Sequence, residues 1–421
     1  MEELVLRFGL YYIFFSFLLF FLFKKYLLSI FDPFLFTVLM MASSLSLSTD
    51  SYFFFYVFFS ILAFTIGFRL IKLPVRSDIK IEKLVDLQLL EIFTILFFIL
   101  YVVLSLYFLK LSGVPLFSDN PTEAKISRFV EGTGWMRRVF FLSNFLLICI
   151  CLLLIVSKKR FLFFVMFITY FLLSILQGSK SGALGIVAVF WYLYQQNNIW
   201  SDSVIYIKRL IKSKMKYFLI VTAVLFLSIV IKEAEIEEEG GNPLFAIGFR
   251  LMEFGDVMIY YKTQIVRDSF ANFNFIDYFL YEFNSIFGML RLTDYYEPMG
   301  YQMVKTYWST SSLFDDVVLG PNTVFFVRGH IFFGYVGGII YSFIIGVLAA
   351  YFRKKIIEIK ITSIFKYALA VYGFFLIPAF LKEFNQAIGT MFDFVFYLGP
   401  IFVLSLIVKE SFNKNKIIIE S

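Results

Sequence analysis

Charged side chains are scarce in this sequence: Asp, Glu, Lys and Arg together make up 16% of its 421 residues. A soluble domain has about a quarter of its residues charged. Hydrophobic residues reach 60% and include 60 Phe, which is more than a soluble fold of this length can bury. The composition therefore excludes a cytosolic enzyme, a secreted module and a disordered chain, and it indicates a protein with several membrane spans.

Cysteine and histidine are almost absent, which excludes further kinds of site. The two cysteines, Cys149 and Cys151, lie in one apolar run and cannot form a disulfide framework. Together with the single histidine, His330, they do not supply the ligands of a zinc centre. The sequence also lacks the GxxxxGKS/T spacing of a nucleotide-binding loop, and its predicted outer segments lack a DxD motif. We therefore expect no metal and no cofactor.

Eleven apolar runs come close to the roughly 20 residues that a membrane-spanning helix needs. Because lipid offers the backbone no hydrogen-bond partner, they predict an all-α bundle of ten to twelve spans, forming one membrane domain over residues 1–421. The second run is the weakest, since Asp32 and Pro33 interrupt its start. The predicted spans are 4–23, 27–48, 52–71, 87–109, 139–156, 161–177, 183–197, 217–232, 331–352, 367–386 and 391–408.

Lys and Arg accumulate in alternate loops, for example at 24–25, 158–160 and 353–355. Such loops are typically cytoplasmic, so we expect the C-terminus inside the cell and the N-terminus outside. The net charge of +7 belongs to these loops and does not indicate binding of nucleic acid. Two long segments then face outward, a first loop over 110–138 and a large one over 233–330.

The large outer loop is rich in Phe and Tyr, unlike a solvated linker. Leu244, Ile247, Leu251, Phe254 and Met258 recur in it at helical spacing, which predicts a short amphipathic helix at the membrane interface. Its aromatic rings offer faces on which sugars stack, or alternatively anchor the loop at the interface. The candidates for sugar stacking are Tyr295, Tyr296 and Trp308.

Cationic residues of the outer segments are candidates for binding phosphate. Arginine offers a planar fork to phosphate oxygens and keeps its charge when it is partly desolvated. Several such residues beside the outer leaflet suit an anionic lipid head such as a diphosphate, although each one alone can equally anchor a span or pair with an acid. The candidates are Arg128, Lys180, Arg250, Arg267, Arg291 and Arg328.

Candidates for a catalytic base lie in the same segments. His330 follows Arg328 at the outer end of the ninth predicted span, where it is either a base or a structural residue. Among the acids of the large loop we select Glu253 and Asp294, although spacing alone does not separate them from neighbours such as Asp256. Any of these groups could remove a proton from a sugar hydroxyl.

Two features of the spans are interpreted as structural. Gly334 and Gly338, four residues apart, predict close packing of helices. Glu91, Glu383 and Asp393 lie in or next to spans, and we expect them to pair within the bundle or to lie at its ends.

Several short segments follow one another in an order typical of one family. They are 113–117 (GVPLF), Arg128 with 132–134 (GTG), 178–182 (GSKSG), 320–323 (GPNT), 333–338 (FGYVGG) and 353–355 (RKK). Together with the one large outer loop between late spans, they make the sequence resemble the bacterial oligosaccharide repeat unit polymerases, also called O-antigen or Wzy-type polymerases. The resemblance covers roughly residues 87–355.

The resemblance implies a glycosyltransferase of the bacterial inner membrane without a nucleotide-sugar site. The expected substrate is an undecaprenyl-diphosphate-linked oligosaccharide, and the growing glycan is transferred onto a new lipid-linked repeat at the outer face. Outer arginines are then the expected ligands of the diphosphate. Lys180 stands where the family often has Arg, which keeps the charge but loses the bidentate fork. A membrane protein that regulates chain length is a candidate partner.

Two other functions are kept as alternatives. The related O-antigen ligases have a catalytic His close to an Asn, a pattern that His330, downstream of Asn322, does not match well. A flippase for lipid-linked oligosaccharides should have charges along many spans and short loops on both sides. This sequence concentrates charge in one large outer loop, which favours the polymerase.

Overall fold

The computed structural model describes residues 2–28, 32–72, 86–117, 134–177, 251–294, 296–308, 320–358 and 363–420, with single positions at 185–193 and 248. Within these ranges the regular elements are helices, and seven of them are long and apolar enough to cross a membrane. The prediction of an all-helical chain with several membrane spans is confirmed. Two of the predicted spans also correspond to shorter apolar helices, α2 (Pro33–Ser48) and α8 (Arg160–Leu176), whereas the predicted spans 183–197 and 217–232 lie largely or wholly outside the described residues.

The chain folds as two compact units, which are described separately. The first consists of Met1–Arg76, Gly240–Ile357 and Phe374–Gly389, and the second of Ser77–Glu239, Glu358–Gly373 and Thr390–Ser421. Both therefore combine segments that are far apart in the sequence. The last two helices, α18 (Ile364–Lys382) and α19 (Phe384–Glu420), each contribute to both units.

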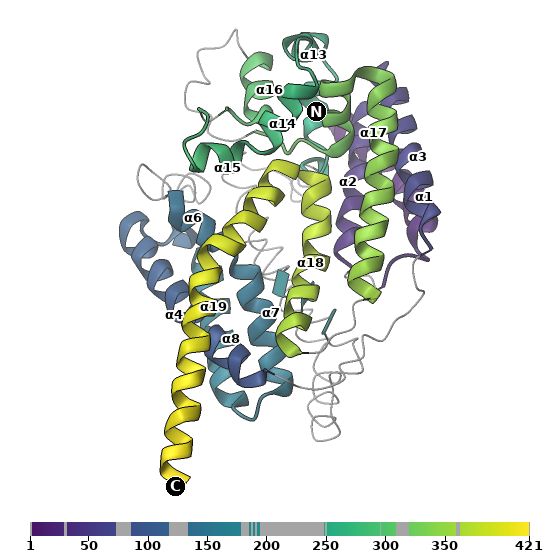
Figure 1. The fold of residues 1–421 in the computed structure, drawn as a ribbon. Coiled ribbons are helices and arrows are strands. Elements are labelled where there is room, and N and C mark those ends of the chain that lie inside the picture. Colours follow the sequence, from purple (N-terminus) through teal and green to yellow (C-terminus); the bar gives the residue numbers. More distant parts are fainter. Residues whose placement is uncertain are drawn as a thin grey trace. The chain divides into compact units, whose positions relative to one another are not determined.

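In the first unit, four long helices lie side by side (Figure 1). The short helices α13–α16 gather near the start of one of them, α17. The long helices are α1 (Glu2–Phe23), α2, α3 (Phe53–Leu70) and α17 (Phe325–Glu358). The short ones are α12 (Val257–Tyr261), α13 (Gln264–Ser269), α14 (Phe275–Glu282), α15 (Asn284–Met289) and α16 (Met299–Tyr307). The short helices all come from the segment predicted as the large outer loop.

Asp32 and Pro33, which weakened the second predicted span, define the start of α2. The Asp32 carboxylate accepts hydrogen bonds from the backbone N–H of Phe34, at 2.9 Å, and of Leu28, at 2.8 Å. Proline fits the first helical turn because its missing N–H would be unpaired there anyway. α2 is buried along most of its length, so it is an inner element of this unit.

Glycines bring α3 and α17 into backbone contact. A Cβ atom on Gly346 would lie 2.2 Å from the carbonyl oxygen of Phe64, and one on Gly338 would lie 2.2 Å from the Tyr56 hydroxyl. The predicted packing role is therefore confirmed for Gly338. It is wrong for Gly334, where a Cβ would meet nothing within 4 Å. Gly334 instead breaks α17, because its φ of 68° and ψ of −166° are open only to glycine.

The helical piece before this break begins at Phe325, whereas the sequence predicted a loop up to residue 330. Arg328 and His330 are thus held on a helix. The predicted amphipathic helix is described from Leu251 onward and is interrupted at Gly255, where a Cβ would lie 2.6 Å from the Ser44 backbone nitrogen. Contact with α2 therefore overrides the helical pattern of the sequence at this point.

The second unit contains α4 (Leu87–Ser112), α6 (Gly134–Phe141), α7 (Ser143–Val156) and α8, with parts of α18 and α19. Glu91 accepts hydrogen bonds from Lys159 Nζ, at 2.9 Å, and from Ser157 Oγ, at 2.5 Å. Asp393 pairs with Arg138 at 2.9 Å. The expectation that Glu91 and Asp393 pair within the bundle is confirmed.

Candidate functional site

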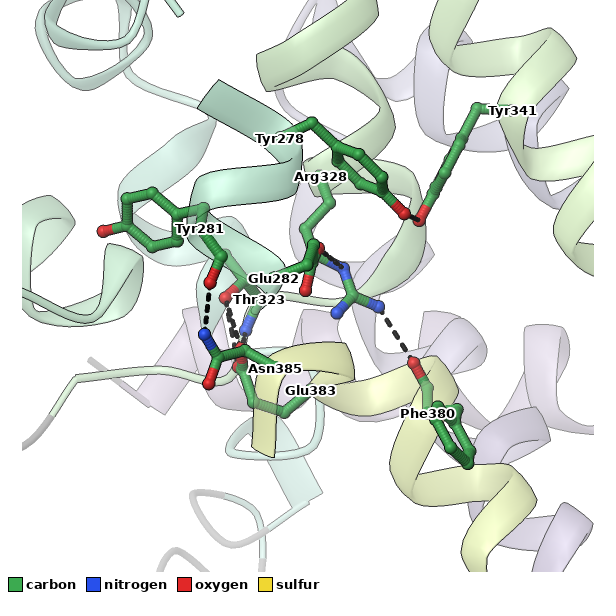
Figure 2. A network of polar contacts seen from close by, with 9 residues as sticks. All are labelled: Tyr278, Tyr281, Glu282, Thr323, Arg328, Tyr341, Phe380, Glu383 and Asn385. Atoms are coloured by element: carbon green, nitrogen blue, oxygen red, sulfur yellow. Dashed lines mark hydrogen bonds and ion pairs between the residues drawn. The ribbon is translucent and has the colours of Figure 1, made fainter. Parts of the chain in front are cut away.

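Arg328 is a charged side chain enclosed within the first unit (Figure 2). Both Arg328 and its neighbour Glu282 have only 1% of their side-chain surface exposed. Arg328 Nη2 donates to the carbonyl oxygen of Phe380 at 3.0 Å, and Nε lies 3.7 Å from Glu282 Oε1. Neither Nε nor Nη1 of Arg328 has a hydrogen-bond partner within the described part of the chain. A buried cation is thus left with unused donors, which is costly for stability.

A second carboxylate, Glu383, lies at the junction between α18 and α19. Its oxygens accept hydrogen bonds from the Thr323 backbone N–H, at 2.7 Å, and from Thr323 Oγ1, at 3.0 and 3.1 Å. Asn385 donates from its side chain to the carbonyl oxygen of Tyr281 in α14. These bonds tie the helix junction to the segment before α17. We call Glu282, Thr323, Arg328 and Glu383 the Arg328 cluster.

The Arg328 cluster has two carboxylates for one guanidinium. Burial raises the pKa of Glu282 to about 7, with the charge of Arg328 opposing the shift and that of Glu383 adding to it. Burial also raises the pKa of Glu383, against the charge of Arg328 and the hydrogen bonds from Thr323. The cluster is therefore able to take up and release a proton near neutral pH.

The GPNT segment is fixed in place by contact between two glycine backbones. A Cβ atom on Gly300, in α16, would lie 1.9 Å from the carbonyl oxygen of Pro321. One on Gly320 would lie 2.1 Å from the carbonyl carbon of Gly300. This contact sets the position of Thr323, and through it the position of Glu383.

We expect Gly300→Ala to lower the thermal stability of the protein by about 1–3 kcal/mol, because the added methyl group has no space. Gly9→Ala is the matched control, since a Cβ at Gly9 in α1 meets nothing within 4 Å. Thermal unfolding in detergent measures both variants. Equal melting temperatures for the two would contradict the tight contact at Gly300.

His330, the predicted base, lies in an aromatic environment. Its Nδ1 is 2.7 Å from the Tyr261 hydroxyl oxygen. Its ring stands edge-on to the rings of Phe53 and Tyr56, at centroid distances of 4.9 and 4.8 Å. The imidazole is half-buried, so it combines a fixed partner at Nδ1 with partial access from outside.

The guanidinium of Arg267, a predicted phosphate ligand, forms several hydrogen bonds with other groups of the protein. Nη1 donates to the carbonyl oxygens of Tyr261, at 3.3 Å, and of Lys262. Nη2 donates to the side-chain oxygen of Gln264 at 2.6 Å, and the guanidinium lies 5.4 Å from the centre of the Phe53 ring. Arg267 thus holds the end of α12, and it shares the Phe53 ring with His330.

Arg291 has an exposed side chain and an unusual backbone. Its φ is 56°, and two hydrogen bonds close the end of α15 around it, from Leu292 N to Phe287 O at 2.9 Å and from Arg291 N to Gly288 O at 3.2 Å. This is a Schellman motif, in which the position of Arg291 is usually taken by glycine. The strain at a non-glycine residue here is compatible with a functional side chain.

The remaining predicted site residues lie at the surface or outside the described residues. Glu253 and Asp294 are exposed. Tyr296 is 41% exposed but stacks with one face on Tyr281 at 5.8 Å, and Trp308 is 39% exposed beside Tyr307. Each of these two rings therefore keeps some surface accessible. Outside the described residues lie Arg128, Lys180, Arg250 and Tyr295.

Two other acids of the predicted large loop, Glu282 and Asp256, are less exposed than Glu253 and Asp294 and lie close to charged side chains. Glu282 was missed, because nothing in its local pattern shows that it is buried beside Arg328. Asp256 was only one of several acids, yet burial raises its pKa to about 7, with the charge of Lys382 opposing and that of Glu253 adding to the shift. Lys382 also acts on Glu383, so it connects Asp256 electrostatically to the Arg328 cluster.

In the described ranges, His, Cys, Asp and Glu form no group of three or more that could hold a metal ion. Neither protein-family models, nor curated proteins, nor solved structures give a significant match to this chain.

Proposed function

We propose that the chain is a membrane glycosyltransferase that polymerises undecaprenyl-diphosphate-linked oligosaccharide repeat units. It would act at the outer face of the bacterial inner membrane, with its C-terminus in the cytoplasm. The proposal rests on Arg328, a predicted phosphate ligand that lies in a buried, charged cluster. Two of its guanidinium nitrogens lack hydrogen-bond partners among the described residues. Fixed donors in a desolvated site are suited to stabilising charge that develops on a leaving group.

In the proposed reaction, a hydroxyl oxygen of the acceptor repeat forms a bond to the anomeric carbon of the donor glycan. The bond from that carbon to the diphosphate oxygen breaks, and the diphosphate leaves with the electron pair. Arg328 would stabilise the leaving diphosphate. Because it is almost fully buried, the side chains that cover it, from α14 and the α18–α19 junction, must move to admit substrate.

The proton of the acceptor hydroxyl needs a base with a pKa close to the working pH. Asp256 meets this requirement, with a pKa raised to about 7, and it is only partly buried. We therefore favour Asp256 over the exposed carboxylates Glu253 and Asp294. His330 is less suited to this role because its Nδ1 is already engaged by Tyr261.

The decisive test is a gel of surface polysaccharide from a strain that lacks the gene, complemented with variants. We expect deletion to collapse the polymer ladder to core plus a single repeat unit, and Arg328→Lys to restore little of it because Lys loses the fork of donors. Membrane abundance and melting temperature of each variant separate loss of activity from loss of folding. A ladder that persists after deletion would refute the polymerase.

The same strain separates the alternatives. If lipid-linked polymer accumulates and no repeat reaches the lipid core, the protein is the ligase. If single repeats stay on the cytoplasmic leaflet, it is the flippase. The buried acids Asp32 and Glu91 pair with Arg353 and Lys159, which favours a structural role for these charges over a transport path.

Arg291 gives a second test within the same assay. Arg291→Gly should raise stability by about 0.5–1 kcal/mol, because glycine adopts the left-handed conformation without strain. Arg291→Lys keeps a positive charge and the strain. If Arg291 binds the diphosphate, the more stable Arg291→Gly variant should make a shorter ladder, whereas Arg291→Lys keeps part of it. A full ladder in Arg291→Gly would remove this residue from the proposed site.

A further inference from the structure

The chain has one histidine, and its hydrogen-bond partner determines which ring nitrogen carries the proton. The Tyr261 hydroxyl is buried, and burial raises its pKa well above the usual value, with the neighbouring Tyr56 adding to the shift. Tyr261 therefore keeps its proton at neutral pH. That proton needs an acceptor, because an unpaired buried hydroxyl is unfavourable.

Within the described part of the chain, the hydrogen-bond partner of the Tyr261 hydroxyl is His330 Nδ1, at 2.7 Å. If Nδ1 carried a proton and donated it, the Tyr261 proton would be left unpaired in a buried position. If Nδ1 is bare, it accepts from Tyr261 and both groups are satisfied. Nδ1 is then the acceptor, and in a neutral imidazole the proton is on Nε2.

The charge near the ring supports the neutral form. The Arg267 guanidinium packs on the same Phe53 ring as His330, with its cation 5.4 Å from the ring centre and the imidazole 4.9 Å from it. The positive charge of Arg267 acts on the imidazole and disfavours a second positive charge there. It also makes the surroundings of His330 favourable for an anion.

We propose that His330 is a hydrogen-bond donor through Nε2, held in this state by Tyr261, and that it binds an anionic oxygen of a phosphate group. This assigns His330 to ligand binding and not to proton removal. Tyr261 acts as a positioning residue. The binding of the substrate diphosphate rests on the proposed function, whereas the protonation state of the ring does not.

The single histidine makes a direct measurement possible. The full chain is labelled with nitrogen-15 histidine, purified with a tag that contains no histidine, and studied by NMR in lipid nanodiscs. We expect a bare, pyridine-type Nδ1 and a protonated Nε2, with this tautomer favoured about tenfold or more. A protonated Nδ1 with a bare Nε2 would overturn the proposal, because Nε2 would then be free to act as a base.

Two conservative variants test the role of Tyr261. Tyr261→Phe removes the donor to Nδ1, and the signals should move toward a mixture of the two tautomers. Tyr56→Phe is the matched control: its ring also contacts His330, but its hydroxyl donates to the carbonyl oxygen of Phe326 at 2.7 Å. Unchanged signals in Tyr261→Phe would show that Tyr261 does not set the tautomer.

Ligand binding is tested with undecaprenyl diphosphate in the nanodiscs and with the polysaccharide ladder in cells. The lipid should shift the Nε2 proton signal, which nanodiscs with undecaprenol alone should not do. His330→Ala should reduce polymer formation by about 100-fold. His330→Gln, whose side-chain amide can donate in place of Nε2, should recover most of it.

The possible failures are distinguishable. If His330→Gln is as inactive as His330→Ala, the donor role is wrong. If His330→Ala keeps the full ladder, His330 does not bind the substrate. If deletion of the whole gene leaves the ladder intact, the proposed function fails. The tautomer measured in the purified protein still decides whether Tyr261 holds His330 with its proton on Nε2.

Discussion

Arg353→Met is expected to leave little folded protein, with a loss of about 3–5 kcal/mol in stability, because it removes one partner of a buried ion pair. Arg353 Nη1 lies 3.0 Å from Asp32 Oδ1, and Nη2 contacts the second carboxylate oxygen and the carbonyl oxygen of Tyr26, the latter at 3.0 Å. Both charged side chains are almost fully buried. The guanidinium also lies 4.5 Å from the centre of the Phe374 ring. Without it, the Asp32 carboxylate would be buried without its partner charge.

A double-mutant cycle makes this prediction specific. Asp32→Asn keeps a good N-cap for α2 but leaves the buried Arg353 charge without its partner. We therefore expect a loss of stability similar to that in Arg353→Met. The double variant has no charge at either of these two buried positions and should lose much less than the sum of the two single losses. Lys355→Met, a cation two residues further along the chain, is the control and should change stability by less than about 0.5 kcal/mol. The yield of monodisperse protein and the melting temperature in detergent measure all four. Additive losses would show that the pair is not coupled.

The Asp32–Arg353 pair shows how far the sequence can be interpreted. The excess of Lys and Arg at 353–355 predicts the end of a span at residue 352, whereas α17 continues to Glu358. The positive-inside rule places all three residues in a loop. It counts charges and does not identify which side chain is buried. The sequence predicts that Asp32 and Pro33 interrupt a span, and in the structure they form the start of α2. That the two positions meet is a tertiary contact between segments far apart in the sequence, and no local pattern contains it.

The candidate site was predictable to a similar extent. Arg328 could be selected because its type and its place beside a predicted span suit phosphate. Glu282 could not, because an acid in an aromatic loop looks solvated until the fold places it beside Arg328. The glycines illustrate the same limit: their spacing predicted packing, which holds for Gly338, whereas Gly334 serves as a break that only its backbone angles reveal.

Glu282→Gln is expected to change how stability depends on pH. The pKa of Glu282 is raised from its usual 4.5 to about 7 in the folded protein. Between these values the folded state binds more protons than the unfolded state, so the contribution of Glu282 falls as pH rises. It is fully present below about pH 4.5 and lost above about pH 7, a difference of about 3 kcal/mol at 1.36 kcal/mol per pKa unit. The melting temperature measured from pH 5 to pH 8 should therefore fall less steeply in Glu282→Gln than in the wild type.

Two controls isolate Glu282 from the other acids. Asp256 is shifted in the same direction and contributes to the same pH window, so Asp256→Asn should remove a separate part of the slope. Glu297→Gln removes an exposed carboxylate that pairs with Lys305 at 3.5 Å, and it should leave the slope unchanged. If Glu282→Gln keeps the wild-type slope, Arg328 holds Glu282 ionised throughout this range.

The outcome bears directly on how Arg328 would serve as a phosphate ligand. When Glu282 is ionised, the guanidinium faces two carboxylates, and their charge repels a diphosphate. When Glu282 takes up a proton, Arg328 is opposed by Glu383 alone, and that carboxylate is also engaged by Thr323. We therefore expect polymer synthesis by the wild type to rise as pH falls from about 8 to about 7, the range in which Glu282 takes up its proton while much of Asp256, the proposed base, is still ionised. Glu282→Gln, which mimics the protonated state, should lose this rise. A wild-type dependence of the opposite sign would show that proton removal, and not the charge of the Arg328 cluster, limits the reaction.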